Sequence, residues 1–517
     1  MIAWRVVACC AAAACSHGAT PTVAIADDPF GYFIDEAAIE VLVDRWSHEH
    51  LAPAQLAFTH VAVISLAHPG VDLDQTLVIA SGRITALGPT ATTTVPAGAT
   101  VVNGRSRFVM PGLVDMHVHT ELSTSNYLLD LANGVTSVRE MNGSPWLLRM
   151  RARERAGAAL TPNLYVAGPI LASAPLGHSA TVVTMGDAAR AEVHAQRLAG
   201  YDFIKVHNVV APDVYTAICE QARVEQLDVV GHIPHDTTIA RALACGQRTF
   251  EHFKSYIDDH TLTLTHEDFV AVTRGAEVWN TPTFATFRSH MRGDEARQFV
   301  RTAPEMRYVS TRDRAAWLAL ANEPANPVQQ NVLPLSEQIF RALLAAGGHF
   351  LAGTDSGGGY PFSVRGFALH TELRIMAEQG MALPDVLRTA TVEPARAMRR
   401  DELGTLEIGK RADLVMLRAN PLDAVANLET IDGVAIRGVW LDRGTLDEML
   451  DAIAKIYAPH AAPSLAHALD ALEQLRARGV PLRDRFLGEL RFHVDAAGIS
   501  TQRPLFDGVA ALPPDPP

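Results

Sequence analysis

The sequence has no surplus of basic residues, and this absence narrows its functions. Its 517 residues include 44 Lys and Arg against 57 Asp and Glu, which gives a formal net charge of −13 at pH 7. A protein that binds a nucleic-acid backbone needs a clustered basic face, so we expect no nucleic-acid partner. Tandem repeats are also lacking. The length and the 48% apolar content predict one large domain with a sizeable core and a smaller accessory module.

Cysteine is scarce as well, which argues against a disulfide framework. Three of the five cysteines, Cys9, Cys10 and Cys15, lie within the first fifteen residues. The other two, Cys219 and Cys245, each lie in an apparently helical stretch without metal-ligand spacing around it. We therefore predict that these two are buried free thiols.

The apolar run at the start of the chain is too short to span a bilayer. In MIAWRVVACCAAAAC one basic residue precedes this run, which is typical of a secretory leader, and we assign residues 1–26 to it. Residues 12–15 resemble a bacterial lipoprotein processing site, so a lipid on Cys15 would anchor the mature chain to a membrane. The alternative is ordinary cleavage after Ala26. Both predict a protein outside the cytoplasm: periplasmic, on the outer surface, or secreted.

Patterns of strand and helix divide the rest of the chain. A helical segment is expected over 27–56, and a helical extension with a loose tail over 446–517. Strand-rich stretches in 57–108 and 404–445 predict a small β-sandwich built from both sides of the central region.

The central region, 109–403, alternates short apolar strands with helices, as in a parallel α/β fold. Eight such units predict a closed (β/α)8 TIM barrel, because every strand then has two neighbours. The strands are expected at 109–117, 135–140, 163–171, 203–208, 229–234, 249–253, 278–284 and 349–355.

Histidines and an aspartate fall where these strands end, on the face where barrels build their active sites. His117 and His119 are two residues apart, so both project from one side of the pleat and can reach one cation. His232 and His252 end two further strands, and neutral imidazole is a good zinc ligand. Asp355 ends the eighth strand, where it could act as both metal ligand and base.

Lys205 lies inside an apolar strand, in the stretch FIKVH, where an unpaired ammonium would carry a large desolvation cost. A structural ion pair would offset this cost. A carbamylated lysine is the other solution, because its carboxylate could bridge two metal ions. The residues alone leave both open.

Five motifs recur in order with these residues: VMPGLVDMHVH, DFIKV, GHIPH, FEHF and GTDSG. With TVEPARAM and LGTLEIGKRADLVML, they resemble the amidohydrolase superfamily, in its binuclear imidazolonepropionase-like and prolidase-like branch, over about residues 57–441. The resemblance implies two divalent cations, most often zinc. It implies that one cation is held by His117, His119 and Asp355, the other by His232 and His252, and that carboxylated Lys205 bridges them.

The resemblance also implies a reaction. Hydroxide shared by the two cations would cleave a C–N bond in a small carboxylated substrate, such as a dipeptide or an N-acyl amino acid, with Asp355 accepting the proton. His178 and Tyr215 occupy positions that contact substrate in the prolidase-like relatives. A solvent-facing loop histidine is the alternative for His178. For His207 and His235, hydrogen bonding to a ligand and substrate contact are equally open.

Other functions fit the same barrel. A mononuclear deaminase or cyclic-amide hydrolase normally lacks the strand lysine, so Lys205 argues against it. Lactone or ester hydrolysis would use the same hydroxide. An inert binding module is disfavoured because all six ligand types are present. The expected partner is a small-molecule substrate, and the sequence leaves homo-oligomerisation open.

Overall fold

The computed structural model describes residues 31–50, 52–120, 123–176, 180–253, 256–258, 261–262, 277–357 and 360–458, and also Ala471, Gln474 and Ala477. The predicted leader with Cys15, the loop residue His178 and most of the predicted C-terminal extension lie outside the described residues.

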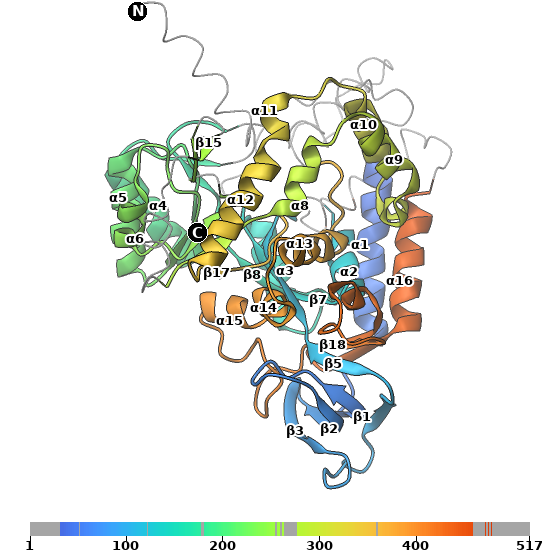
Figure 1. The fold of residues 1–517 in the computed structure, drawn as a ribbon. Helices are drawn as coiled ribbons and strands as arrows, with labels where there is room; N and C mark the ends of the chain where they lie inside the picture. The colour runs from blue at the N-terminus through green and yellow to red at the C-terminus, as the bar shows by residue number, and fades with distance from the viewer. Residues whose placement is uncertain are drawn as a thin grey trace, which may run out of the picture.

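Strands from both flanks of the central region lie in one eight-stranded sheet, at the lower end of the molecule in Figure 1. Its order is β20-β19-β18-β5-β1-β2-β3, and β4 pairs with β1. The two flanks meet where β18 runs antiparallel to β5. Alternating apolar residues such as Phe58, Leu77 and Leu414 form its core. The strands are β1 (Gln55–Val63), β2 (Asp72–Ala80), β3 (Arg83–Pro89), β4 (Thr100–Asn103), β5 (Phe108–Pro111), β18 (Leu414–Leu417), β19 (Ile431–Ile436) and β20 (Val439–Asp442).

The strand predicted at 109–117 is two strands. β5 ends at Pro111 in the eight-stranded sheet, and β6 (Leu113–Val118) begins a different, parallel sheet. Gly112 joins them beside the side chain of Thr136 on β7, because a Cβ there would lie 2.1 Å from the Thr136 hydroxyl oxygen. The Pro111-Gly112 pair, a turn signal within the apolar run, marks this change of sheet in the sequence.

The central region is α/β with parallel sheets, as predicted. One sheet contains β6, β7 and β8, and the other has the order β10-β9-β11-β12-β13-β16-β17. Two parallel bridges connect these sheets, Ala167 with Phe203 and Val118 with Ser356. The remaining strands are β7 (Val135–Glu140), β8 (Asn163–Val166), β9 (Leu171–Ala172), β10 (Thr181–Val182), β11 (Phe203–Val206), β12 (Asp228–Gly231), β13 (Thr249–Glu251), β16 (Trp279–Thr281) and β17 (His349–Phe350), with a separate pair β14 (Ile257–Asp258) and β15 (Thr261–Leu262).

Helices cover the parallel strands, which is why β6, β7, β8 and β11 are buried along their whole length. The longest, α1 (Gly31–Glu49), packs beside α16 (Arg443–Ile456) from the other end of the chain (Figure 1). Among the described helices, none combines the length and the apolarity needed to cross a bilayer. The others include α2 (Ser125–Ala132), α3 (Pro145–Arg155), α4 (Gly186–Ala199), α5 (Pro212–Val224), α6 (Ile239–Cys245), α8 (Phe284–Phe287), α9 (Gly293–Thr302), α10 (Thr311–Ala321), α11 (Pro327–Gln330), α12 (Val332–Ala345), α13 (Phe367–Glu378), α14 (Leu383–Thr389) and α15 (Val392–Ala397), with the 3-10 turns η3 (Arg288–His290), η4 (Pro304–Tyr308) and η5 (Val425–Glu429).

The prediction of two free thiols is wrong. Cys219 on α5 and Cys245 at the end of α6 form a disulfide, with their Cα atoms 5.4 Å apart. The two helices follow neighbouring strands β11 and β12, so they pack side by side on the sheet. Two cysteines separated by 26 residues show no such proximity in the sequence, because it arises only from the strand order.

Removing this disulfide should destabilise the chain without changing any residue of the strands. In the Cys219→Ser/Cys245→Ser double variant we expect the free energy of unfolding to fall by about 2–4 kcal/mol, because the cross-link restricts the unfolded chain. Chemical denaturation measures this fall. Alkylation of the denatured wild type should label neither cysteine before reduction and both after it. Labelling of either without reductant would contradict the disulfide.

Candidate metal centre

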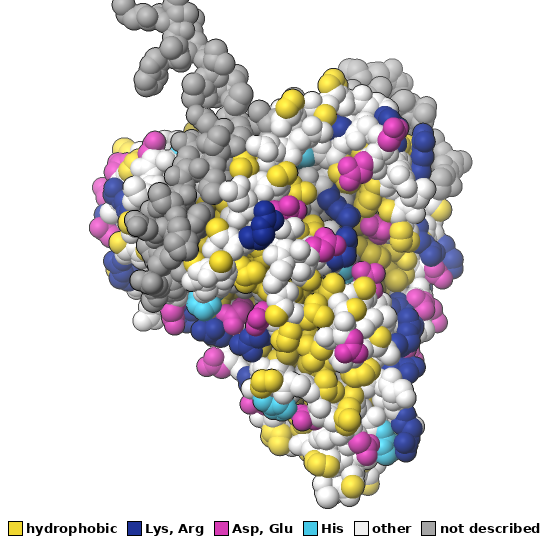
Figure 2. Space-filling view, in the orientation of Figure 1, with side chains coloured by type: hydrophobic (Ala, Val, Ile, Leu, Met, Phe, Trp, Pro, Cys, Tyr) yellow, Lys and Arg dark blue, Asp and Glu magenta, His cyan; other side chains and the backbone are white. Residues whose placement is uncertain are grey.

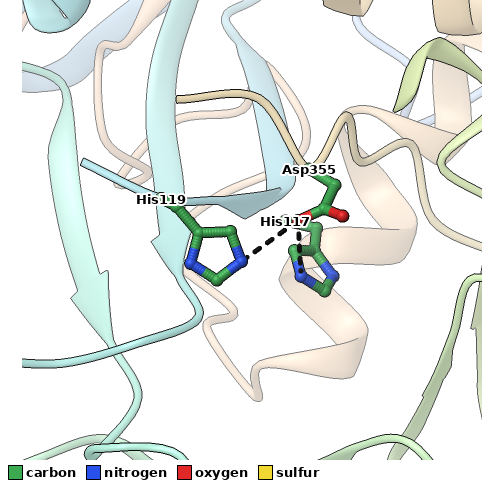
Figure 3. Close-up of side chains that lie close together, drawn as sticks. All are labelled: His117, His119 and Asp355. Atoms are coloured by element: carbon green, nitrogen blue, oxygen red, sulfur yellow. Dashed lines mark ion pairs between the residues drawn. The ribbon is translucent and has the colours of Figure 1, made fainter. Parts of the chain in front are cut away.

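Three of the predicted ligands lie together at the end of β6 and on the segment that follows β17 (Figure 3). The Nε2 atom of His119 is 3.0 Å from Oδ1 of Asp355, and Nε2 of His117 is 3.4 Å from the same oxygen. The ligand atoms of the three residues all lie within 4.8 Å of one another. Two imidazole nitrogens and a carboxylate oxygen at this spacing can share one cation.

Backbone hydrogen bonds bring three histidines to the same depth. Each donates its backbone N–H to a carbonyl on the adjacent strand or just beyond it: His119 to Ser356 (2.9 Å), His232 to Val206 (3.1 Å) and His252 to Thr281 (2.8 Å). Parallel strands in register thereby place residues that are far apart in sequence around one point.

His252 and His232 extend the cluster away from His119. The ring centroid of His252 lies 4.6 Å from that of His117 and 5.1 Å from that of His232. Nδ1 of His252 is 2.7 Å from the Thr283 hydroxyl oxygen, and 3.8 Å from Oδ2 of Asp355. The hydrogen bond to Thr283 orients the His252 ring within the cluster.

Three residues of this region have left-handed backbone conformations, which are costly for residues other than glycine. The φ angles are 56° at Asp355, 66° at His252 and 54° at Thr283. At Asp355 the backbone N–H donates to the His117 carbonyl oxygen over 2.7 Å. The packed strand ends therefore impose the direction of both candidate ligands.

Lys205 lies on β11, and only 2% of its surface is exposed. Its aliphatic stem runs close to the next strand, since a Cβ added to Gly231 would lie 2.9 Å from the Lys205 Cδ atom. Burial and then the positive charge of Lys205 lower the pKa of His117 well below its ordinary value. The lysine is therefore close enough to the candidate ligands to affect their protonation.

Glu251 and Arg139 orient His117, and the sequence reasoning missed both. Glu251 Oε2 accepts a hydrogen bond from His117 Nδ1 (2.8 Å), while Oε1 accepts from Arg139 Nη2 (2.8 Å) and from the Thr249 hydroxyl. Burial would raise the pKa of Glu251, but the charge of Arg139 holds it well below its ordinary value. Both residues carry the signal that singled out Lys205, an ionisable group within an apolar strand.

The hydrogen bond between His117 Nδ1 and Glu251 leaves Nε2 of the same ring to bind a cation. Nε2 of His117 is buried and has no hydrogen-bond partner among the residues that the structure describes. With the proton held at Nδ1 by Glu251, Nε2 carries its lone pair toward Asp355. The donor set thus fits a divalent metal ion that accepts nitrogen and oxygen ligands.

Weakening the contact between Glu251 and His117 should weaken metal binding. For Glu251→Gln we expect an affinity about 10- to 100-fold lower, because an amide is a weaker acceptor for Nδ1–H. Competition with a chelator of known affinity measures this. Glu407→Gln, which changes an exposed glutamate paired with Lys410 (3.1 Å), is the matched control. Equal affinities in the two variants would refute the orienting role.

A buried aspartate also ties His117 to Asp355. Asp115 accepts hydrogen bonds from the backbone N–H of His117 (3.2 Å) and of Thr354 (3.0 Å), and from the Thr354 hydroxyl (2.7 Å). Burial raises the pKa of Asp115 to about 6. This carboxyl group therefore joins β6 to the segment that carries Asp355.

Three further residues that were predicted near the substrate or the ligands are Tyr215, His207 and His235. Tyr215 is fully buried on α5, where its hydroxyl donates to Gln247 Oε1 (2.6 Å), and its role as a substrate contact stays a prediction. The helix turns this side chain inward between α5 and the sheet. His207 is buried with its ring centroid 4.7 Å from that of His232. Nε2 of His235 lies 2.6 Å from the Asn208 side-chain amide.

Comparison with known proteins matches residues 108–441 to the amidohydrolase family, a range that contains all six predicted ligands. The chain belongs to the amidohydrolase family. This confirms the resemblance seen in the sequence, and it makes the chain a hydrolase that acts on carbon–nitrogen bonds. No protein with a curated description matches its sequence.

Solved structures of hydrolases share the fold. Bottromycin amidohydrolase is 25% identical with a TM-score of 0.67, and the match covers 84% of this chain and 98% of that one. A Xaa-Pro dipeptidase with bound methionine is 20% identical, with a TM-score of 0.60 and coverage of 75% and 100%. The ochratoxinase of A. niger is 17% identical, with a TM-score of 0.58 and coverage of 75% and 95%. The last two matches support the fold alone.

Proposed function

We propose that this amidohydrolase is a metal-dependent enzyme that cleaves the amide or peptide bond of a small carboxylated substrate, such as a dipeptide or an N-acyl amino acid. The observation that carries the proposal is the meeting of His117, His119 and Asp355 from opposite ends of the central region. The bottromycin amidohydrolase likeness supports the amide bond as the target. The carboxylated substrate follows from the prolidase-like motifs.

We also propose that eight of the parallel strands close into a (β/α)8 barrel, with the eight-stranded sheet as its β-sandwich. The two bridges support closure, since one links β8 to β11 through Ala167 and the other links the segment after β17 to β6 through Ser356. Each of the eight strands then has a neighbour on both sides. The site lies at the C-terminal ends of these strands, where barrel enzymes carry their chemistry.

The residues fit two divalent cations, which we take to be zinc. His117, His119 and Asp355 would hold one ion, and His232 and His252 the other. Carboxylated Lys205 would bridge them: an ammonium beside two cations is repulsive, whereas the carbamate of the same side chain carries a negative charge. Bound there, the cations would lower the pKa of a shared water to about 7 and polarise the substrate carbonyl.

Asp355 supplies the proton transfers in this proposal. Although burial alone would raise its pKa, the neighbouring imidazoles of His252, His117 and His119 hold the pKa below its ordinary value, so the side chain is a carboxylate at neutral pH. Its Oδ1 atom faces both His117 and His119 (Figure 3), and the carboxylate can accept a proton from the attacking water. The same carboxyl group then protonates the leaving nitrogen.

A substrate screen tests the proposal. Zinc-loaded protein is incubated with N-acyl amino acids and dipeptides, and the released amine is measured, with Lys205→Ala as control. We expect turnover of some members by the wild type and little by the variant. Turnover of lactones or esters alone would replace the amide assignment, and equal turnover by the variant would remove the bridging role of Lys205.

We further propose that the protein works outside the cytoplasm, either secreted or anchored through a lipid on Cys15. The disulfide between Cys219 and Cys245 supports this, because such bonds persist mainly in oxidising compartments.

A further inference from the structure

A cavity of about 670 Å³ lies apart from the candidate metal centre. Residues of α9, η4, α13 and α16 line it, and none of the six predicted metal ligands does. Figure 2 shows basic and acidic side chains gathered over the place where α13 faces α9 and α16 in Figure 1. The proposed reaction gives this cavity no role.

Positive charge in this cavity is not fully balanced by the protein. Arg288 is half-buried, and no carboxylate forms an ion pair with it within 4.0 Å in the part of the chain that the structure describes. Burial and then the like charge of Arg374 lower the pKa of Arg288. Arg374 is itself paired with Glu378 (3.5 Å), so the partly desolvated Arg288 is the guanidinium that favours the binding of an anion.

The acidic residues that line the cavity do not remove this excess. Asp447 is already paired with Arg443 (3.0 Å), and Glu429 is exposed. Glu305, which is half-buried, acts on Arg288 only from beyond ion-pair distance. An anion that reaches Arg288 therefore gains a partner that these carboxylates do not supply.

Apolar rings form another part of the wall. The rings of Tyr308 and Phe367 are stacked, with centroids 5.5 Å apart and an angle of 18° between their planes. Phe299 lies next to the basic group, since the Arg288 guanidinium carbon is 5.7 Å from its ring centroid. A ligand that binds here has an apolar surface to cover as well as a charge to neutralise.

We propose that this cavity binds a small organic carboxylate, whose charge lies against Arg288 and Arg374 and whose apolar body packs on Tyr308 and Phe367. The combination of a cationic end and an aromatic wall selects such a molecule over an inorganic anion or an amine. This site is separate from the metal centre and does not depend on the reaction proposed there.

Calorimetric titration of the full, metal-loaded chain with phenylacetate tests the proposal. We expect Arg288→Gln to bind about tenfold more weakly or worse, because it loses a charge-assisted hydrogen bond. Arg190→Gln should bind as the wild type does, since Arg190 does not line the cavity and pairs with Glu220 (2.8 Å). Asp355→Asn should also retain binding, which separates this site from the metal centre. If Arg288→Gln proves unstable, Arg374→Gln, with a side chain 41% exposed, provides the same test.

Several results would overturn the inference. These are wild-type affinity in Arg288→Gln, loss of binding in Asp355→Asn alone, no heat of binding by the wild type at millimolar phenylacetate, and equal affinity for phenethylamine or inorganic phosphate. Equal affinity for phenethylamine would show that charge does not select the ligand. Equal affinity for phosphate would show that the aromatic wall does not contribute to binding.

Discussion

The Lys205→Ala variant is expected to lose about a thousandfold or more in kcat/KM and to retain less metal than the wild type. A bridging carboxylate holds both cations, and metal assistance contributes several kcal/mol to such reactions, where each 1.4 kcal/mol or so is a factor of ten. Lys205 is buried beside His117, so alanine would also leave a space next to the ligands. Steady-state kinetics and metal analysis of the same samples measure both effects.

Lys410→Ala is the matched control, because that lysine lies at the surface in an ion pair with Glu407 (3.1 Å). Added propionate should restore part of the activity of Lys205→Ala, since its carboxylate can occupy the place of the lost bridge. A structural ion pair would give no such rescue. Full metal content with wild-type turnover in Lys205→Ala would exclude the bridge.

The second large effect is expected from Asp355→Asn, which should lower kcat by about 10²- to 10⁴-fold. Asparagine keeps the size of the side chain and one carbonyl oxygen, but it cannot carry a proton from the attacking water to the leaving nitrogen. Because the pKa of Asp355 lies below its ordinary value, the wild-type carboxylate is present at neutral pH and the loss should extend across that range. Rate measurements as a function of pH test this.

The metal content of Asp355→Asn separates its two proposed roles. A variant that keeps its metal and loses its rate has lost the base, whereas one that loses metal has lost a ligand. Asp385→Asn, at an exposed position in the first turn of α14, controls for the change of charge. Wild-type kcat in Asp355→Asn with full metal content would contradict any role in proton transfer.

The parts of the site that follow from local patterns were predictable from the sequence. Each of the eight expected strands contains strand residues in the structure, because short apolar runs between helices have few other ways to be buried. The ends of parallel strands share one edge, so ligand-type residues at those ends could be expected to approach one another. His117, His119 and Asp355 do so.

Features that depend on which distant segments pack together were not predictable in this way. Glu251 bonds to His117 across 134 residues, and no periodicity says which buried carboxylate faces which imidazole. The Cys219–Cys245 disulfide and the inward direction of Tyr215 both depend on how α5 packs against its neighbours. In each case the structure depends on tertiary contacts, and a single sequence does not show which residues make them.

Six side chains on or just after the parallel strands are proposed to hold two cations together, and metal determination on the purified wild-type chain decides whether they do. After dialysis against metal-free buffer, elemental analysis should find about two zinc ions per chain, and fewer in Lys205→Ala. One ion per chain, unchanged by the loss of Lys205, would contradict the shared bridge. No bound metal in protein that still hydrolyses amides would contradict the account altogether.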